Sequence, residues 1–245
     1  YKKKRFLPLA RFLFFLLVCG ALAMAMTLFF KVERVEVSGS SRYDAGQVIT
    51  AARVDLGDNL FLLNKYDIED RVTTALPYIG EVRIRRRLPS TLTIEVHETQ
   101  AAAAVELAGE YWLISDQGKL LERSASREGL VQIVGAMPLM PSAGSVLALA
   151  KEASITVDRL LELLRVLEEK GLADIIGTID CSDLRILALR YGDRFWVELR
   201  YDADFPAKMD QLVEAIALLE ENERGTIRMT YDKGEVHFIP DETGT

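Results

Sequence analysis

The sequence predicts an α+β protein: one transmembrane helix, a small domain, then a mixed β domain with antiparallel hairpins and two helices. Two observations predict this fold class. A long apolar run lies near the N-terminus, and beyond it amphipathic helix patterns intersperse with the apolar–polar alternation of half-buried strands. We expect a cytoplasmic tail at residues 1–11 and a transmembrane helix at 12–30. A first domain should follow at residues 31–98, a second domain at 99–240 and a C-terminal tail at 241–245.

The apolar run at residues 12–30 predicts the transmembrane helix. Its nineteen residues carry no charge, and a helix of that length spans about 28 Å, close to the hydrocarbon thickness of a bilayer. Residues 1–11 hold five cations and no acid, so the positive-inside rule places them in the cytoplasm and everything after Phe30 outside. A cleaved signal peptide is the alternative, because residues 21–25 contain small-residue spacings, but a signal's apolar stretch is shorter.

The first domain is expected to follow the order strand, helix, helix, strand, strand, at residues 35–37, 44–52, 67–76, 82–85 and 91–96. Asp44 is the predicted N-cap of the first helix. Asp67 is expected to open the second helix, with Asp70 at a spacing like that of a capping box, and Pro77 to end it. Leu88, Pro89 and Ser90 form the expected turn between the last two strands.

The second domain is expected to begin with a hairpin at residues 111–121 and to contain strands at 131–134, 175–180, 186–191 and 195–199. Ser154 or Thr156 should cap a helix that Gly171 closes. A two-residue turn, residues 192–193, joins two of the strands. Pro206 suits the first turn of another helix, whose expected inner face is Met209, Leu212, Val213 and Ile216. The chain should end in a hairpin of strands at 226–231 and 235–239.

The charge distribution argues against a general nucleic-acid binder. The chain carries −7 overall, and because the N-terminal tail is cationic, the remainder is more acidic still. Backbone recognition of nucleic acids needs clustered cations on an accessible face. One such cluster exists at Arg83, Arg85, Arg86 and Arg87, but we expect it to be a solvated strand face opposite Glu95 and neighbouring acids. We therefore expect no nucleic-acid partner.

The inventory of reactive residues is poor. The histidines, His97 and His237, both lie on strand patterns without a companion Cys or His, so no metal site is expected. The cysteines, Cys19 and Cys181, are not expected to meet. Ser-x-x-Lys, Gly-x-Ser-x-Gly, His-Glu-x-x-His, the P-loop and the dinucleotide fingerprint are absent from the sequence. We expect no enzyme, no cofactor and no small-molecule substrate, although a carboxylate pair for glycoside cleavage stays open.

Two stretches carry a family resemblance. Residues 30–39, FKVERVEVSG, directly follow the apolar run and resemble the opening of a POTRA domain, and residues 82–96, VRIRRRLPSTLTIEV, resemble its closing hairpin. A membrane helix followed by one POTRA domain resembles the FtsQ/DivIB family of bacterial cell-division proteins, and the ending at residues 225–240 is similar to the DivIB branch. The resemblance covers about residues 12–240. Three positions depart from the family pattern. Relatives often have an aromatic-rich segment at residues 101–104, Gly at the position of Arg200 and Asp at the position of Arg228.

The resemblance implies a septal plasma-membrane scaffold without catalysis, which recruits bitopic division proteins of the DivIC/FtsB and FtsL type through C-terminal strands. The matching positions here are Thr230, Tyr231, Gly234, Val236 and Phe238. A last strand often forms a sheet edge that can accept a partner strand. We expect Val236 and Phe238 to share a core face, which leaves Tyr231 as the better contact. The alternatives are a membrane-anchored cell-wall hydrolase and a secreted chaperone or transport accessory with a POTRA domain.

Overall fold

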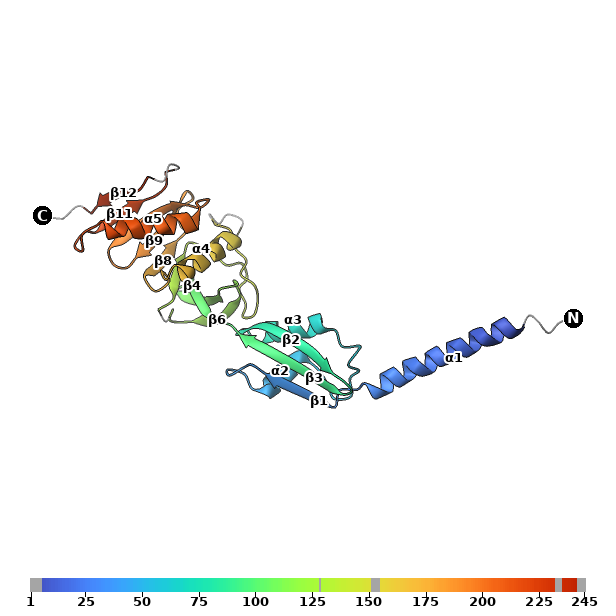
Figure 1. Ribbon diagram of the computed structural model, residues 1–245. Helices are drawn as coiled ribbons and strands as arrows, with labels where there is room; N and C mark the ends of the chain where they lie inside the picture. Colours follow the sequence, from blue (N-terminus) through green and yellow to red (C-terminus); the bar gives the residue numbers. More distant parts are fainter. Residues whose placement is uncertain (1–5, 128, 151–154, 232–234, 242–245) are drawn as a thin grey trace. The chain divides into compact units, whose positions relative to one another are not determined.

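The computed structural model describes residues 6–127, 129–150, 155–231 and 235–241. The chain divides into two compact units, Tyr1–Glu98 and Thr99–Thr245, and each has its own hydrophobic core (Figure 1). The predicted fold class is confirmed, because a long apolar helix precedes a small unit of two helices on a three-stranded sheet and a larger β-rich unit.

The N-terminal helix α1 spans Phe6–Phe29. Its stretch Arg11–Phe29 is long and apolar enough to cross a membrane, and none of it is buried against the rest of the chain. An uninterrupted apolar surface without a protein partner is what a lipid-facing helix presents.

The rest of the first unit follows the predicted order, with β1 at Arg34–Ser38, α2 at Ala45–Ala52, α3 at Lys65–Ala75, β2 at Ile79–Arg87 and β3 at Thr91–Glu98. The sheet order is β1-β3-β2, with β1 parallel and β2 antiparallel to β3. Alternation along β2 and β3 directs one set of side chains inward, where they meet the helix residues Val48, Ile68 and Val72 in a dry core.

Cap residues set where the two short helices begin. Asp44 caps α2 as predicted, and it forms a capping box in which its carboxylate accepts from Gln47 N at 2.8 Å while Asp44 N donates to the Gln47 side chain at 3.0 Å. The predicted start of α3 at Asp67 is wrong. Asn64 is the cap, accepting from Tyr66 N at 3.1 Å and donating to Asp67 Oδ1 at 2.9 Å, so Asp67 lies inside the first turn.

The arginine cluster lies on β2 and is matched by acids. Ion pairs join Arg83 to Glu81 at 2.7 Å, Arg85 to Glu95 at 3.4 Å and Arg87 to Glu36 at 3.1 Å. Arg86 points the other way and donates to the carbonyl of Leu63 at 2.7 Å. Exposed pairs of this kind contribute little stability, but they neutralise the cations that a nucleic acid would need.

The second unit is built on one nine-stranded sheet in the described part of the chain, in the order β12-β11-β10-β9-β8-β7-β4-β5-β6. Its elements are β4 Ala101–Leu107, β5 Glu110–Ser115, β6 Leu120–Ser124, β7 Val131–Val134, α4 Val157–Glu169, β8 Ile176–Asp180, β9 Ile186–Tyr191, β10 Phe195–Arg200, α5 Phe205–Ala217, β11 Gly225–Arg228 and β12 His237–Pro240. Helices α4 and α5 bury their apolar stripes in a single core with the inward residues of the strands, such as Ile133, Leu189 and Val197.

Four details of the second unit differ from the sequence-based expectations. Residues 101–104 form part of the interior strand β4, which the run of alanines concealed because it has no alternation. The β9–β10 turn has three residues, since Phe195 pairs with Tyr191. Val213 is exposed, and Phe205 takes a buried place on α5 instead. The final strands are shorter than expected, and residues 232–234 lie outside the described residues.

Glu98, the last residue of β3, ties down the connection between β1 and α2. Its carboxylate accepts hydrogen bonds from Arg42 N and the Ser40 hydroxyl at 2.7 Å each, and from the Ser41 hydroxyl at 2.9 Å. These donors, led by Arg42 N, lower the pKa of Glu98 from 4.5 to about 2. A carboxyl group with a lowered folded-state pKa stabilises the fold above its unfolded pKa, and that stabilisation is lost as pH falls toward the folded pKa.

We therefore expect Glu98→Gln to lower the urea midpoint of the first unit at neutral pH. The difference in urea midpoint between the variant and the native chain should stay constant above about pH 5. It should shrink as pH falls from 4.5 toward 2. The protein's two tryptophans, Trp112 and Trp196, both lie in the second unit. Far-UV circular dichroism should thus register the shift while tryptophan fluorescence stays unchanged, and a gap that does not vary with pH would contradict the role of the Glu98 charge.

Candidate protein-docking edge

The two ends of the nine-stranded sheet differ in how they are finished. At one end, the segment at residues 144–147 pairs with residues 118–120 at the start of β6, with Leu120 N donating to Ser145 O at 2.8 Å and Leu147 N donating to Gly118 O at 2.7 Å. At the other end, β12 has β11 as a neighbour and, among the described residues, no strand on its outer side (Figure 1). Sheet edges are covered or blunted in most proteins; β12 is not covered among these residues, and its last residue, Pro240, has no N–H to offer a partner.

The register of β12 determines which backbone groups face outward. Thr226 pairs with Ile239 and Arg228 with His237. Asp241 N donates to Arg224 O at 2.9 Å, two residues further along, so these alternate pairs are the hydrogen-bonded ones. In an antiparallel ladder every second residue bonds the neighbouring strand. The N–H and C=O groups of His237 and Ile239 are therefore directed toward β11, and those of Phe238 are directed toward the open edge. Val236 lies one residue before β12, and extending the alternation by that residue gives its N–H the same outward direction.

Close backbone approach holds β12 in its place. A Cβ atom on Gly225 would lie 2.2 Å from the carbonyl oxygen of Ile239, so a side chain there would force the two strands apart. On the core side, the Phe238 ring meets the buried ring of Phe195 edge to face with centroids 6.0 Å apart, and Val236 packs against the same core. The structure thus places both Val236 and Phe238 on the inner face.

Tyr231 is exposed beside the edge, with 45% of its surface accessible. Its ring lies 4.8 Å from that of His237 on the outer face of the sheet, and its backbone carbonyl accepts from Lys208 Nζ of α5 at 3.5 Å. Thr230 is half-buried next to it, whereas Gly234 lies outside the described residues. Of the four described positions among those expected from the resemblance, Tyr231 presents the most accessible apolar surface.

The outer face also carries groups that the sequence reasoning missed. Arg228 pairs with Glu198 of β10 at 2.6 Å, and this hydrogen-bonded carboxylate raises the pKa of Arg228. Trp196 lies on the same face, and the Arg190 guanidinium lies 5.2 Å from its ring centre. The signal was present in the sequence, because Phe195 and Val197 alternate inward and leave Trp196 at an outward position.

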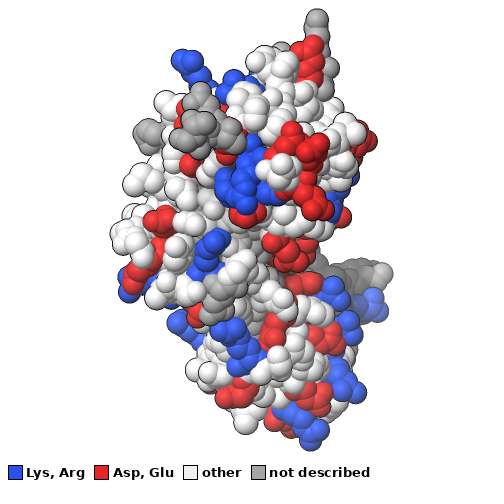
Figure 2. Space-filling view, turned by 90° about the vertical axis from the view of Figure 1, so that its left-hand side faces the viewer, with Lys and Arg blue, Asp and Glu red and all other residues white. Residues whose placement is uncertain are grey.

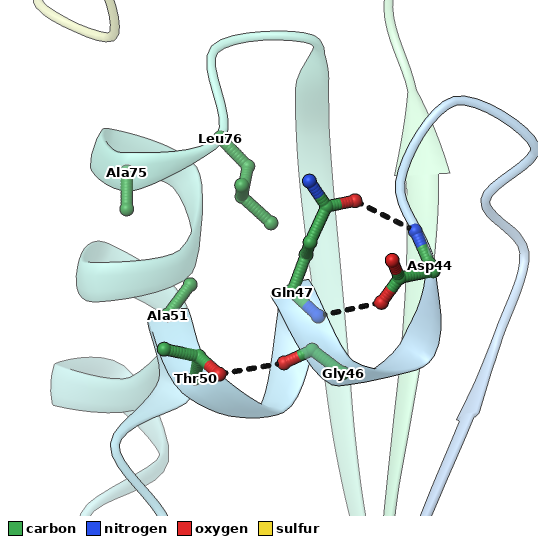
Figure 3. A pocket seen from close by; sticks show the side chains of 7 residues that line it. All are labelled: Asp44, Gly46, Gln47, Thr50, Ala51, Ala75 and Leu76. Carbon is green, nitrogen blue, oxygen red and sulfur yellow. Dashed lines mark hydrogen bonds between the residues drawn. The ribbon is translucent and has the colours of Figure 1, made fainter.

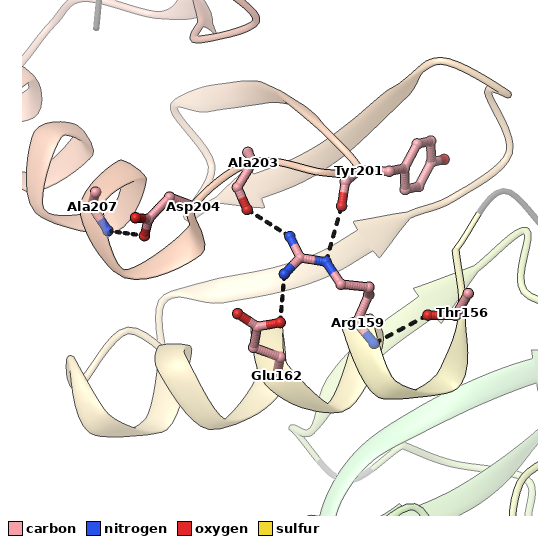
Figure 4. Close-up of polar contacts among 7 residues, drawn as sticks. All are labelled: Thr156, Arg159, Glu162, Tyr201, Ala203, Asp204 and Ala207. Atoms are coloured by element: carbon pink, nitrogen blue, oxygen red, sulfur yellow. Dashed lines mark hydrogen bonds and ion pairs between the residues drawn. The ribbon is translucent and has the colours of Figure 1, made fainter. Parts of the chain in front are cut away.

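Arg159 of α4 supports this end of the sheet from within. Its guanidinium donates to the carbonyls of Tyr201 at 3.2 Å and Ala203 at 2.5 Å, and to the carboxylate of Glu162 at 2.5 Å (Figure 4). It also stacks 4.1 Å from the ring centre of Phe205, at the start of α5. One cation therefore fixes the connection from β10 into α5, and α5 leads directly to β11.

No metal centre occurs in the described residues. They contain no group of three or more His, Cys, Asp or Glu side chains able to hold a metal ion. A shallow hollow of about 490 Å³ lies between α2 and the end of α3, where Ala51, Ala75 and Leu76 line it (Figure 3). Its acid, Asp44, is already engaged in capping α2. On the face drawn in Figure 2, basic and acidic side chains alternate, and no extended cationic surface forms.

Comparison with known proteins points in one direction. The POTRA domain of FtsQ type matches residues 30–99. Over 97% of its length the chain is similar to cell division protein DivIB of Clostridium botulinum (strain Loch Maree / Type A3), with 23% identity and 93% of the relative covered. It is 22% identical to DivIB of Clostridium tetani over 86% of the chain and 80% of the relative. It is 31% identical to cell division protein FtsQ of Corynebacterium glutamicum over 43% of the chain and 47% of the relative.

We expect Phe238→Ala to destabilise the second unit by about 1.5–3 kcal/mol, since the ring is partly buried against Phe195 and its removal leaves apolar surface uncovered. Tyr231→Ala removes an exposed ring and should change the unfolding free energy by less than about 0.5 kcal/mol. Urea unfolding followed by tryptophan fluorescence measures both. Equal effects of the two substitutions would contradict the assignment of Phe238 to the core face and Tyr231 to the surface.

Proposed function

The chain belongs to the FtsQ/DivIB family of cell division proteins, and on that premise we propose that it is a membrane-anchored scaffold of the bacterial division complex. It recruits its partners by adding their strands to the open edge of β12. In this proposal the chain performs no chemistry of its own. The observation that carries the proposal is the edge of β12, which has no strand on its outer side among the described residues, whereas residues 144–147 cover the start of β6 at the other end of the sheet.

Strand addition suits the geometry of β12. The outward N–H and C=O groups of Phe238 can pair with an extended segment of another chain, and each such hydrogen bond contributes about 0.5–1.5 kcal/mol net. A four-residue strand offers few of these bonds, so the backbone alone would bind weakly. Affinity and selectivity then depend on an anchoring side chain, and Tyr231, exposed and amphipathic beside the edge, suits that role.

The anchor helix strengthens such weak pairing. If α1 spans the plasma membrane with residues 1–11 in the cytoplasm, both folded units lie outside, at the septum where division occurs. The proposed partners are bitopic division proteins of the DivIC/FtsB and FtsL type, which share the same membrane. Confinement to one bilayer raises the effective concentration of a partner strand, so a modest edge affinity suffices.

The proposal predicts that Tyr231→Ala weakens capture of a DivIC- or FtsL-type partner by about 30-fold, the effect of losing an interface anchor of about 2 kcal/mol. The partner and the full chain would be reconstituted together and capture measured by crosslinking. Val146→Ala is the matched control, because Val146 is an exposed apolar residue bridged to Lys119 at the opposite end of the sheet. Equal capture by both folded variants would remove Tyr231 from the interface.

A further inference from the structure

The loop between α2 and α3, residues 53–64, is bonded to the end of the apolar helix α1. The Asn59 side-chain amide donates to the carbonyls of Met26 and Thr27 at 3.2 Å each, and these belong to the last turn of α1. Leu60 N donates to Phe30 O at 2.9 Å. The last carbonyls of a helix otherwise lack partners, so this loop completes the helix and lies beside its end.

Asn59 also shapes the loop. Its side-chain oxygen accepts from Phe61 N at 2.9 Å and Leu62 N at 3.3 Å, which fixes a tight turn. The same amide group therefore joins the helix end to the turn, one side donating and the other accepting. An edge-to-face contact of Phe61 with Phe30, centroids 5.0 Å apart, adds a second link.

The turn presents large apolar side chains that the core does not use. Leu60 enters the core, whereas Leu62 is 79% exposed and Leu56 is 71% exposed. Tyr66, in the first turn of α3, is exposed as well. Two exposed leucines and two aromatic residues on one short segment are costly in water.

The setting indicates what covers them. Phe29 is the last residue of α1 and Phe30 the last of the uncharged run, and aromatic side chains prefer the membrane interface at that depth. The charges within residues 53–65 balance, with Arg53 and Lys65 offset by Asp55 and Asp58, so the segment's own side chains give no net attraction for an anionic surface. Two cations contact the loop from outside it, Lys31 through its bridge to Asn59 and Arg86 through its bond to the Leu63 carbonyl. Apolar contact dominates.

We propose that this loop inserts Leu56, Phe61 and Leu62 into the lipid bilayer beside the point where α1 emerges, so that the first unit is seated on the membrane as well as tethered to it. Tyr66 lies at the headgroup level, where a ring with a polar end is favoured. The inserted side chains extend the apolar surface of α1 sideways, and their insertion requires no anionic lipid. It rests on the proposed role of α1 as a membrane-spanning anchor.

The test uses the full chain with a nitroxide spin label in vesicles of phosphatidylcholine alone. Cys181 is buried and burial raises the pKa of its thiol to about 12, so the native chain is labelled at Cys19 of α1. In a Cys19→Ala background, Leu62→Cys labels the turn. Thr74→Cys is the matched control, exposed on α3 about 15 Å along the helix from its start.

We expect the label at position 62 to be relaxed mainly by oxygen, which partitions into lipid, and to be shielded from a water-soluble nickel complex. The Thr74→Cys label should show the reverse, and the Cys19 label should resemble that at position 62. If the label at position 62 behaves like that at position 74 while the Cys19 label is shielded from the nickel complex, α1 still spans the bilayer but the loop does not insert into it. If Cys19 itself is relaxed by the nickel complex, α1 does not span the bilayer, and both ideas fall.

Discussion

The backbone edge of β12, which has no outer strand among the described residues, is the constraint on which the proposed function depends. Its outward N–H and C=O groups need a partner, which is water in the free chain and another strand in the proposed complex. The remainder of the second unit holds this edge in a defined position. Phe195 seats Phe238, Gly225 permits close approach of β12, and Arg159 fixes the connection into α5. Because the edge is already ordered in the free chain, most of the conformational entropy lost on binding would be lost by the partner strand.

The proposed scaffold combines contacts that are individually weak. A four-residue strand edge, one tyrosine anchor and a single membrane helix would each bind poorly alone. Joined in one chain and confined to one bilayer, they act on partners at a raised effective concentration. The loop at residues 53–64 would add to this by restricting how far the first unit can tilt from the membrane. In this proposal, assembly is reversible because each contact is of modest strength.

Short-range signals were predictable from the sequence. The cap Asp44 and the strand at 131–134 are set by neighbouring residues, and the structure has them as expected. For α4 the sequence left Ser154 and Thr156 as candidates, and the structure has Thr156 as the cap. Where local signals competed, the prediction was wrong, as with Asn64 and Asp67 at the start of α3. On α5 the sequence predicted Val213 on the inner face, whereas the structure buries Phe205 there and leaves Val213 exposed. Residues at the boundary of an amphipathic stripe are difficult to assign from the sequence.

Long-range pairing set the limit of the sequence reasoning. No pattern reveals that the alanine run at 101–104 forms the interior strand β4, or that β11 joins the sheet parallel to β10 and so places β12 last. At the candidate site, Tyr231 came from the resemblance together with its residue type. Trp196 and the Arg228–Glu198 pair were missed because they lie beside the edge only once β10, β11 and β12 are adjacent.

A pair of substitutions at Val236 tests strand addition most directly. Val236 lies one residue before β12, and extending the alternation of the strand by that residue directs its N–H toward the open edge, while its side chain packs against the core. Val236→Pro removes that donor together with part of the side-chain packing, whereas Val236→Ala removes packing alone. With both variants folded by tryptophan fluorescence, we expect capture of the division partner to be lost in Val236→Pro and retained in Val236→Ala. Equal capture by the two variants would contradict docking through the β12 edge.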